Sequence, residues 1–236
     1  ADEFHQRLEE VNRTFTKIAV VTPFTSKWKT LFPNADIIAQ DYVLGFPNAD
    51  YDLVIHAMGL HRENDPVGQI IQCRNALKPD GMFLAACFGG QTLVELGSAL
   101  AQAEIRLKGG MSPRVHPMAE IRDLAGLLQR SGLALPVADS LIQNVSHGSL
   151  LALLHDLRHM GETNKLTQRP KGFAPKTLFT EAAQILGTNA PIQSTFEILF
   201  LNGWVPHESQ QKPMRPASAS FHLTEVLEKV DDEKDN

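Results

Sequence analysis

Short runs of apolar, often β-branched residues alternate along the chain with stretches in which apolar residues recur every three or four positions. The runs predict strands at residues 17–21, 36–39, 51–55, 82–87, 135–145 and 195–201, and the helical spacing predicts helices at 1–13, 66–77, 92–108, 118–130, 148–160 and 176–186. A further helix contains Trp28, with Thr25 or Ser26 as its cap. This alternation is typical of an α/β fold with a Rossmann-like, doubly wound and mostly parallel sheet. The last strand follows inserted helices, and an antiparallel direction is open to it.

Residues 51–90 form the central strand–helix–strand unit of this pattern. Pro66 opens its helix, the sequence Lys-Pro-Asp-Gly at 78–81 is expected to end the helix and turn the chain, and the second strand leads into Gly89 and Gly90. In open parallel sheets, ligands bind beyond the carboxyl ends of the strands. We therefore expect a binding site near His56, Ala57, Met58, Gly89 and Gly90.

Composition indicates a single domain over residues 1–223, with an inserted helical region at about 148–190 and a charged tail at 224–236. The net charge of −5 gives no basic field for nucleic acid. No run of about 18 apolar residues is present to span a membrane. The two cysteines, Cys73 and Cys87, are expected to be buried free thiols in a reducing compartment, and the N-terminus lacks an apolar signal segment. These features predict a cytoplasmic protein.

Several long motifs carry a resemblance to a known family. They are GGQTLVELGSALAQAE, GGMSPRVHPMAEIRDLAGLLQRSGLALPVADS, LLHDLRHMGETN, TFEILFLNGWVPHESQQKP and RPASA. Together with residues 51–81, they resemble class I S-adenosylmethionine-dependent methyltransferases of the type 11, BioC-like group. Within that group they resemble the branch whose mitochondrial member is a complex I assembly factor. The resemblance covers roughly residues 41–223 and implies a methyltransferase fold with S-adenosylmethionine as the cofactor.

The chain departs from this family at the loop after the first strand. Working members carry a glycine-rich loop there, which lets the backbone approach the methionine part of the cofactor. Here the strand runs into Thr22, Pro23 and Phe24, without a glycine. The acidic residue that holds the ribose hydroxyls has only Asp36 and Asp41 as candidates, and Asp41 stands nearest the family position.

The resemblance also implies a substrate side built from loop and helix-end residues. Arg114 and His116 lie in a loop stiffened by prolines, where Arg114 could clamp an anion or form a salt bridge that holds the loop. His56 and His61 could serve as general bases, although a lone histidine is more often structural. The family motif after the helix at 148–160 adds Arg158, Glu162 and Asn164, which could equally satisfy a helix end.

These observations leave three hypotheses. The first is a methyltransferase-like protein of the complex I assembly-factor branch that modifies a protein; the resemblance leaves the reaction open, because the mitochondrial member is associated with arginine hydroxylation. The second is a non-catalytic binding or assembly module, and the third is a fold that takes another nucleotide or acyl ligand. A metal site is not expected, because His155 and His159 share a helix face without a third ligand.

Overall fold

The computed structural model describes residues 2–187 and 191–211 and divides into two compact units, 1–206 and 207–236. The first unit contains every helix and strand in the described residues, and the predicted boundary at 223 and the tail at 224–236 lie outside those residues. Its sheet has the strand order β2-β1-β3-β4-β6-β5. Strands β1 (Ile18–Thr22), β2 (Asp36–Ala39), β3 (Tyr51–Ala57) and β4 (Leu77–Phe88) are parallel, and β6 (Ile192–Trp204) runs antiparallel between β4 and β5 (Ala134–His147). The α/β fold with a doubly wound, mostly parallel sheet is therefore confirmed.

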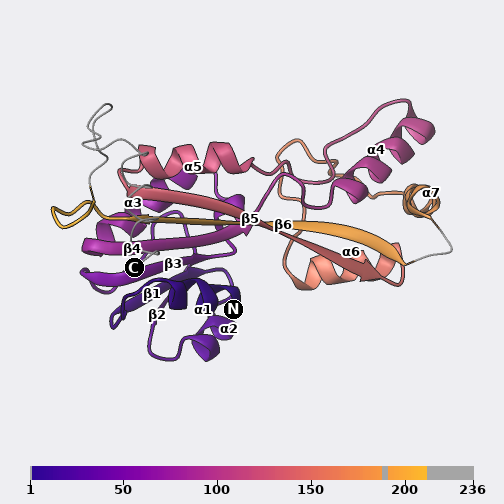
Figure 1. Ribbon diagram of the computed structural model, residues 1–236. Coiled ribbons are helices and arrows are strands. Elements are labelled where there is room, and N and C mark those ends of the chain that lie inside the picture. Colours follow the sequence, from indigo (N-terminus) through magenta and orange to yellow (C-terminus); the bar gives the residue numbers. More distant parts are fainter. Residues whose placement is uncertain (1, 188–190, 212–236) are drawn as a thin grey trace, which may run out of the picture. The chain divides into compact units, whose positions relative to one another are not determined.

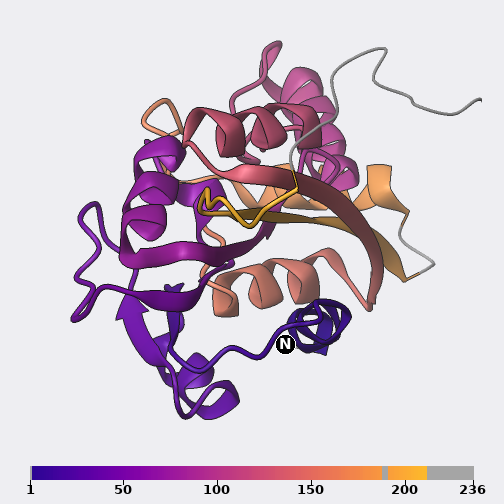
Figure 2. The ribbon, with the colours of Figure 1, turned by 60° about the vertical axis from the view of Figure 1, so that its left-hand side comes forward.

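Helices cover both faces of the sheet, which explains why β3 is buried along its whole length. On one face, α3 (Pro66–Ala76) and α5 (Ile121–Arg130) contribute Ile70, Cys73, Leu124 and Leu128 to a core with alternate strand residues. On the other face, α1 (Asp2–Glu10) and α2 (Thr25–Leu31) bury Phe4 and Trp28, whose rings meet edge to face at 5.3 Å. Figure 2 shows these layers from the side.

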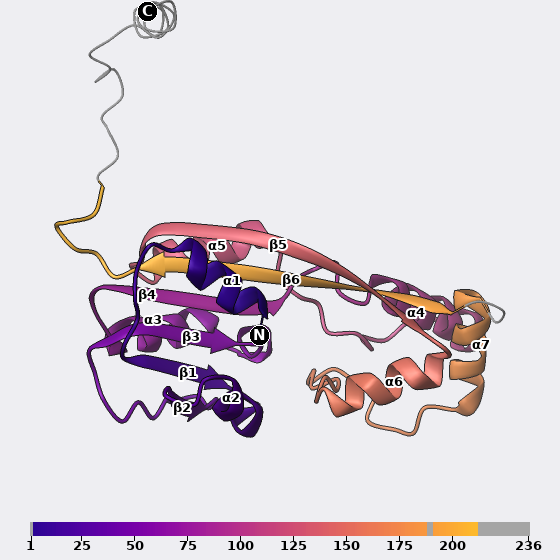
Figure 3. The same ribbon diagram turned by 60° about the horizontal axis from the view of Figure 1, so that its bottom comes forward.

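The two longest strands, β5 and β6, extend past the ends of β3 and β4 and carry a second group of helices (Figures 1 and 3). These are α4 (Val94–Lys108), α6 (Leu150–His159) and α7 (Lys176–Leu186). Their apolar faces form a separate core that includes Leu96, Leu100, Leu153, Leu178 and Phe196. The inserted helices therefore build a wall beyond the carboxyl ends of the parallel strands.

The predicted turn at 78–81 is wrong, because these residues belong to β4, which begins directly after α3. Asp52, buried on β3, holds them there through an ion pair with Lys78. The β3–β4 register shifts between Tyr51 and Leu53, so that Tyr51 is opposite Leu77 and Leu53 opposite Met82. Asp80 takes a left-handed φ of 61° within this bulge.

Other element ends also differ from the prediction. Neither Thr25 nor Ser26 caps α2, because the helix already begins at Thr25 and Phe24 is the cap without a side-chain hydrogen bond. Helix α4 starts at Val94, later than predicted, because Thr92 Oγ1 bonds the backbone of Glu197 and Leu93 adopts a left-handed φ of 58°. A short 3-10 helix, η1 (Leu60–Arg62), follows β3. No helix in the described part of the chain is long and apolar enough to cross a membrane.

Candidate functional site

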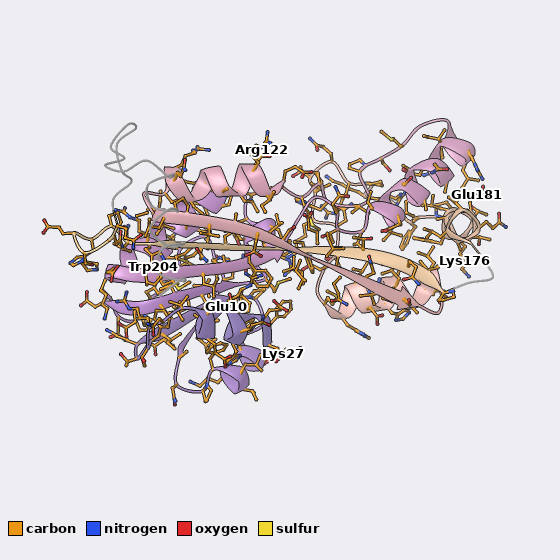
Figure 4. The ribbon with its side chains drawn as sticks, in the orientation of Figure 1. Glu10, Lys27, Arg122, Lys176, Glu181 and Trp204 are labelled. Carbon is orange, nitrogen blue, oxygen red and sulfur yellow. The ribbon has the colours of Figure 1, made fainter. Side chains whose placement is uncertain are left out.

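A cavity of about 900 Å³ lies at the carboxyl ends of the parallel strands. Phe24 contributes to it from the end of β1, Met58 from the end of β3 and Phe88 from the end of β4. Lys27 of α2 also lines it, and Figure 4 shows this side chain beside the carboxyl ends of the strands. The site therefore lies where the parallel topology predicts a ligand to bind.

Most of the cavity wall is apolar and partly aromatic. Phe88 and Phe196 stand with their ring centres 5.8 Å apart, and the ring of His61 packs edge-on against Phe88 at 5.0 Å. Trp28 completes the aromatic part of the lining. Further lining residues come from α2, β5, β6 and the end of α6: Leu31, Gln143, Val145, His147, Asp156, His159, Met160 and Ile198.

Glu162 is the carboxylate that follows α6 and lines the cavity. His61, nearly buried, accepts the Phe88 N–H at Nδ1 (3.4 Å), so its Nε2 is the donor toward Glu162 Oε1 at 3.3 Å. Arg62 Nε lies 3.3 Å from the same oxygen, and its guanidinium also donates to the Gly161 carbonyl. Burial works to raise the pKa of Glu162, but the hydrogen bond from His61 and the charge of Arg62 outweigh it and hold that pKa below its ordinary value. The structure thus brings together the predicted residues His61 and Glu162 and fixes Glu162 as a carboxylate.

The predicted cofactor residues after β1 do not offer free backbone donors. Thr22 is buried, and its Oγ1 accepts the N–H of Phe24 at 3.2 Å. Pro23 has no N–H to donate. Phe24 projects its ring into the cavity lining, so this loop contributes apolar surface where the family has glycines.

A side chain also covers the backbone at the end of β3. Gln40, which follows β2, donates through Nε2 to the Gly59 carbonyl at 2.9 Å and to Glu63. Its Oε1 is buried without a hydrogen-bond partner among the described residues, and a Cβ built on Gly59 would overlap it. Gln40 therefore fills the space over Gly59, and neither residue lines the cavity.

Five other predicted cofactor residues, His56, Ala57, Asp41, Gly89 and Gly90, lie outside the cavity lining. The prediction that His56 flanks a strand mouth is wrong, because β3 continues to Ala57 and buries both side chains. Burial lowers the pKa of His56 to about 4, and its Nε2 lies 3.4 Å from Gln69 Oε1. Asp41 is exposed and bonds the N–H of its neighbour Tyr42. Gly89 is covered by the side chain of Glu197, and Gly90 by that of Glu120.

The predicted anion clamp is engaged within the fold. Arg114 donates to the buried Glu104 on α4 at 2.6 Å, and Ser112 bonds the second carboxylate oxygen through its N–H and hydroxyl. Asn164 donates to the carbonyls of Pro113 and Arg114, at 2.7 and 3.0 Å. Arg114 thus forms the salt bridge that was the alternative to an anion clamp, and Asn164 binds the backbone of the same loop.

The remaining substrate-side predictions are also displaced from the cavity. His116 is exposed and its Nδ1 lies 2.7 Å from the Pro117 carbonyl. Arg158 is exposed and lines a separate groove of about 770 Å³ between α6 and α7, together with Leu151, Lys176 and Phe179. Figure 4 shows Lys176 on α7, away from Lys27.

Sequence reasoning missed His147 and Asp156, which line the cavity and lie 3.1 Å apart. The alternation of Gln143, Val145 and His147 on β5 could have shown that they share a face. It could not have shown that this face looks into a cavity, because that depends on how α6 packs. Within the described residues no three His, Cys, Asp or Glu side chains gather as a metal site requires, and the expectation of no metal stays a prediction.

The amino-acid sequence of the chain is similar to those of several named proteins. No family model matches the chain. It is 37% identical over 79% of its length to arginine-hydroxylase NDUFAF5 of Dictyostelium discoideum, covering 44% of that protein. It is 31% identical over 94% of its length to the NDUFAF5 protein of Danio rerio, covering 70% of it. It is also 27% identical over 65% of its length to the malonyl-[acyl-carrier protein] O-methyltransferase of Nitrosospira multiformis, covering 49% of it.

Solved structures show the same fold. A candidate methyltransferase from Bacillus halodurans superposes with a TM-score of 0.57 at 8% identity, over 88% of this chain and all (100%) of that one. A candidate type II methyltransferase from Anaeromyxobacter dehalogenans gives a TM-score of 0.52 at 18% identity, over 88% of this chain and 97% of that one. The Rossmann-like methyltransferase fold is therefore confirmed.

These relatives correct one prediction and confirm another. The prediction of a cytoplasmic protein is wrong, because the NDUFAF5 relatives of Dictyostelium discoideum, Danio rerio and Homo sapiens are all named as mitochondrial. The resemblance to the methyltransferase-like, complex I assembly-factor branch is confirmed by relatives of both kinds. The chain belongs to the arginine-hydroxylase NDUFAF5 family.

Proposed function

We propose that the chain binds an arginine side chain of a protein partner in the cavity and takes part in modifying it. The observation that carries this proposal is the chemistry of the lining, with the rings of Phe24, Trp28, Phe88 and Phe196 and the carboxylate of Glu162. A guanidinium is flat, always charged and weakly hydrated, so it stacks on aromatic faces and pairs with carboxylates. The name of the relatives supports arginine as the side chain concerned.

Within this proposal the protein's own groups position the guanidinium. The apolar wall would take the arginine stem, as long cationic side chains bury their methylenes against apolar surface. Glu162 would accept the guanidinium N–H groups, since His61 and Arg62 leave carboxylate lone pairs available. A water-poor wall strengthens this charged hydrogen bond.

We further propose that S-adenosylmethionine does not fit this chain in the usual position of the fold as the described residues stand. The Phe24 N–H already donates to Thr22 Oγ1, Pro23 has no N–H, and the Gln40 side chain fills the space over Gly59. S-adenosylmethionine bound at the ends of β1 and β3 would require the Gln40 side chain to move. No chemical step is therefore assigned to this cofactor.

The relatives' names favour a modifying role over a purely non-catalytic module, because they are named as enzymes. They also support a mitochondrial or mitochondrion-related setting, with a subunit of respiratory complex I as the protein partner that the resemblance implies. The chain spans 44% of the length of the Dictyostelium discoideum relative and 70% of the length of the Danio rerio relative.

The test is mass spectrometry of complex I subunits from cells of the organism that encodes the chain. The gene is deleted, then restored as the wild type or as the Glu162→Gln variant. We expect one arginine to carry an added oxygen atom in the wild type, to lose it on deletion, and to regain little of it with Glu162→Gln. An arginine modification pattern that does not respond to the deletion would reject the proposal.

A further inference from the structure

A histidine–carboxylate pair shares the cavity lining with Glu162. His147 is the last residue of β5, and Asp156 lies on α6, nine positions later in the sequence. The imidazole Nδ1 lies 3.1 Å from Asp156 Oδ2, and the His147 side chain is only 7% exposed. Asp156 is 57% exposed and lies at the cavity rim.

The imidazole faces the cavity. Gln143, Val145 and His147 alternate along β5, and all three line the cavity, as residues on one face of a strand must. The second ring nitrogen, His147 Nε2, is buried and has no hydrogen-bond partner in the part of the chain that the structure describes. A buried polar nitrogen without a partner destabilises the fold unless something else bonds it.

Anchoring α6 to β5 does not explain this arrangement. Ser149 already caps α6 by accepting the Ala152 N–H at 3.1 Å. Leu150, Leu153 and Leu157 bury the inner face of the helix in the apolar core. An anchor would use Nδ1 alone and would not explain why Nε2 of a cavity-lining residue is buried without a partner among the described residues.

We propose that His147 Nε2 accepts an N–H of the guanidinium bound in the cavity and that Asp156 is its positioning residue. The inference rests on the proposed function for the identity of the ligand. When Nδ1–H donates to Asp156, the neutral ring keeps its lone pair on Nε2. A guanidinium has five N–H donors in a planar fork, so it can bond Glu162 on one edge and His147 on another.

The experiment is nitrogen-detected NMR of the histidine rings in the full chain, titrated with Nα-acetyl-arginine amide. The His147→Gln variant assigns the signal, and the neutral Nα-acetyl-citrulline amide is the matched ligand control. His155→Gln is the matched protein control, because His155 lies on α6 but lines the α6–α7 groove. The indole signal of Trp28, which lines the cavity, reports ligand entry independently.

We expect the His147 ring to carry its proton on Nδ1 in the free protein and Nε2 to shift when the arginine amide is added. Asp156→Asn should mix the two neutral tautomers, and His147→Gln should weaken binding about tenfold, whereas His155→Gln changes neither. A proton on Nε2 in the free protein, or a Trp28 shift without a His147 response, would overturn the inference and leave the proposed function standing. If Trp28 and His147 both ignore the arginine amide, the guanidinium assignment fails as well.

Discussion

Two side chains that lie far apart in the sequence define the acidic part of the site. His61 and Glu162 are 101 positions apart, yet their side chains meet at 3.3 Å. His61 lies in the short helix η1 after β3, while Glu162 follows α6. Only the packing of the inserted helices brings the two side chains together. The Phe88 N–H fixes the His61 ring, which in turn fixes the Glu162 carboxylate.

Replacing Glu162 with Gln should weaken the binding of an arginine-containing ligand by about tenfold, because the charged acceptor is lost while the shape is kept. Calorimetric titration with Nα-acetyl-arginine amide measures the change. Glu181→Gln is the control, since Glu181 pairs with Arg106 and does not line the cavity. Equal affinities for the two variants would remove Glu162 from the site.

The contact between Gln40 and Gly59 gives a prediction about stability. The Gly59→Ala change should lower the free energy of unfolding by about 1–3 kcal/mol, because the new methyl group must displace the Gln40 amide. Gln40→Ala in the same chain removes the overlap and should restore most of the loss. Urea unfolding measures both, and Gly45→Ala is the control because a Cβ there meets no atom within 4 Å. Identical losses for Gly59→Ala and Gly45→Ala would show that Gln40 does not fill this space.

The element order was predictable because each strand and helix has a clear local pattern. Asp36–Ala39 and Lys176–Leu186 match the predicted bounds, and the antiparallel direction left open for the last strand is what β6 adopts. Tertiary contacts override the local pattern where the prediction fails. Lys78 looked like part of a turn, but its ion pair with the buried Asp52 keeps this segment in β4.

The difference between local pattern and tertiary contacts also explains which site residues could be predicted from the sequence. Arg114 was a reasonable anion clamp because its loop is rigid and exposed in the sequence pattern. The sequence could not show that Glu104, which looks like a surface residue of a helix, is buried and takes the guanidinium. His147 was missed because it belongs to none of the family motifs, and Asp156, although it stands in the motif LLHDLRHMGETN, has no local signal that it meets a strand residue nine positions earlier.

The contact between α4 and the loop that contains Arg114 should make the free energy of unfolding depend on pH. Burial works to raise the pKa of Glu104, but the hydrogen bonds from Arg114 and Ser112 outweigh it and lower that pKa to about 2. Since an unfolded glutamate titrates at about 4.3, the contribution of Glu104 is complete above that pH and is lost as the pH falls toward about 2.

Arg114→Ala should therefore lower the free energy of unfolding by about 3 kcal/mol near pH 7, because it leaves the buried Glu104 with only the half-exposed Lys108, at 3.8 Å, as a cationic partner among the described residues. The difference between the variant and the wild type should shrink on acidification. Urea unfolding at several pH values measures it, and Arg106→Ala is the control because Arg106 is 59% exposed in its pair with Glu181. A pH-independent difference would contradict the assignment of Glu104 as the buried carboxylate.

For the whole molecule, the methyltransferase fold and the changed cofactor loop lead to one account. The parallel strands still end at a cavity, but Pro23 and Phe24 follow β1 without a glycine, and Gln40 covers the backbone at Gly59 after β3. What stays open is the region between Phe24, Phe88 and the inserted helices, where the lining is aromatic and acidic. The methyltransferase fold is kept, and much of the cavity lining comes from β5, β6 and α6.

A crystal structure of the chain grown with Nα-acetyl-arginine amide decides between this account and its alternatives. The account predicts the guanidinium among Phe24, Phe88 and Phe196, within hydrogen-bonding distance of Glu162 and with Gln40 still over Gly59. An arginine amide found only in the α6–α7 groove, or a cavity that stays without it at saturating ligand, would contradict the account.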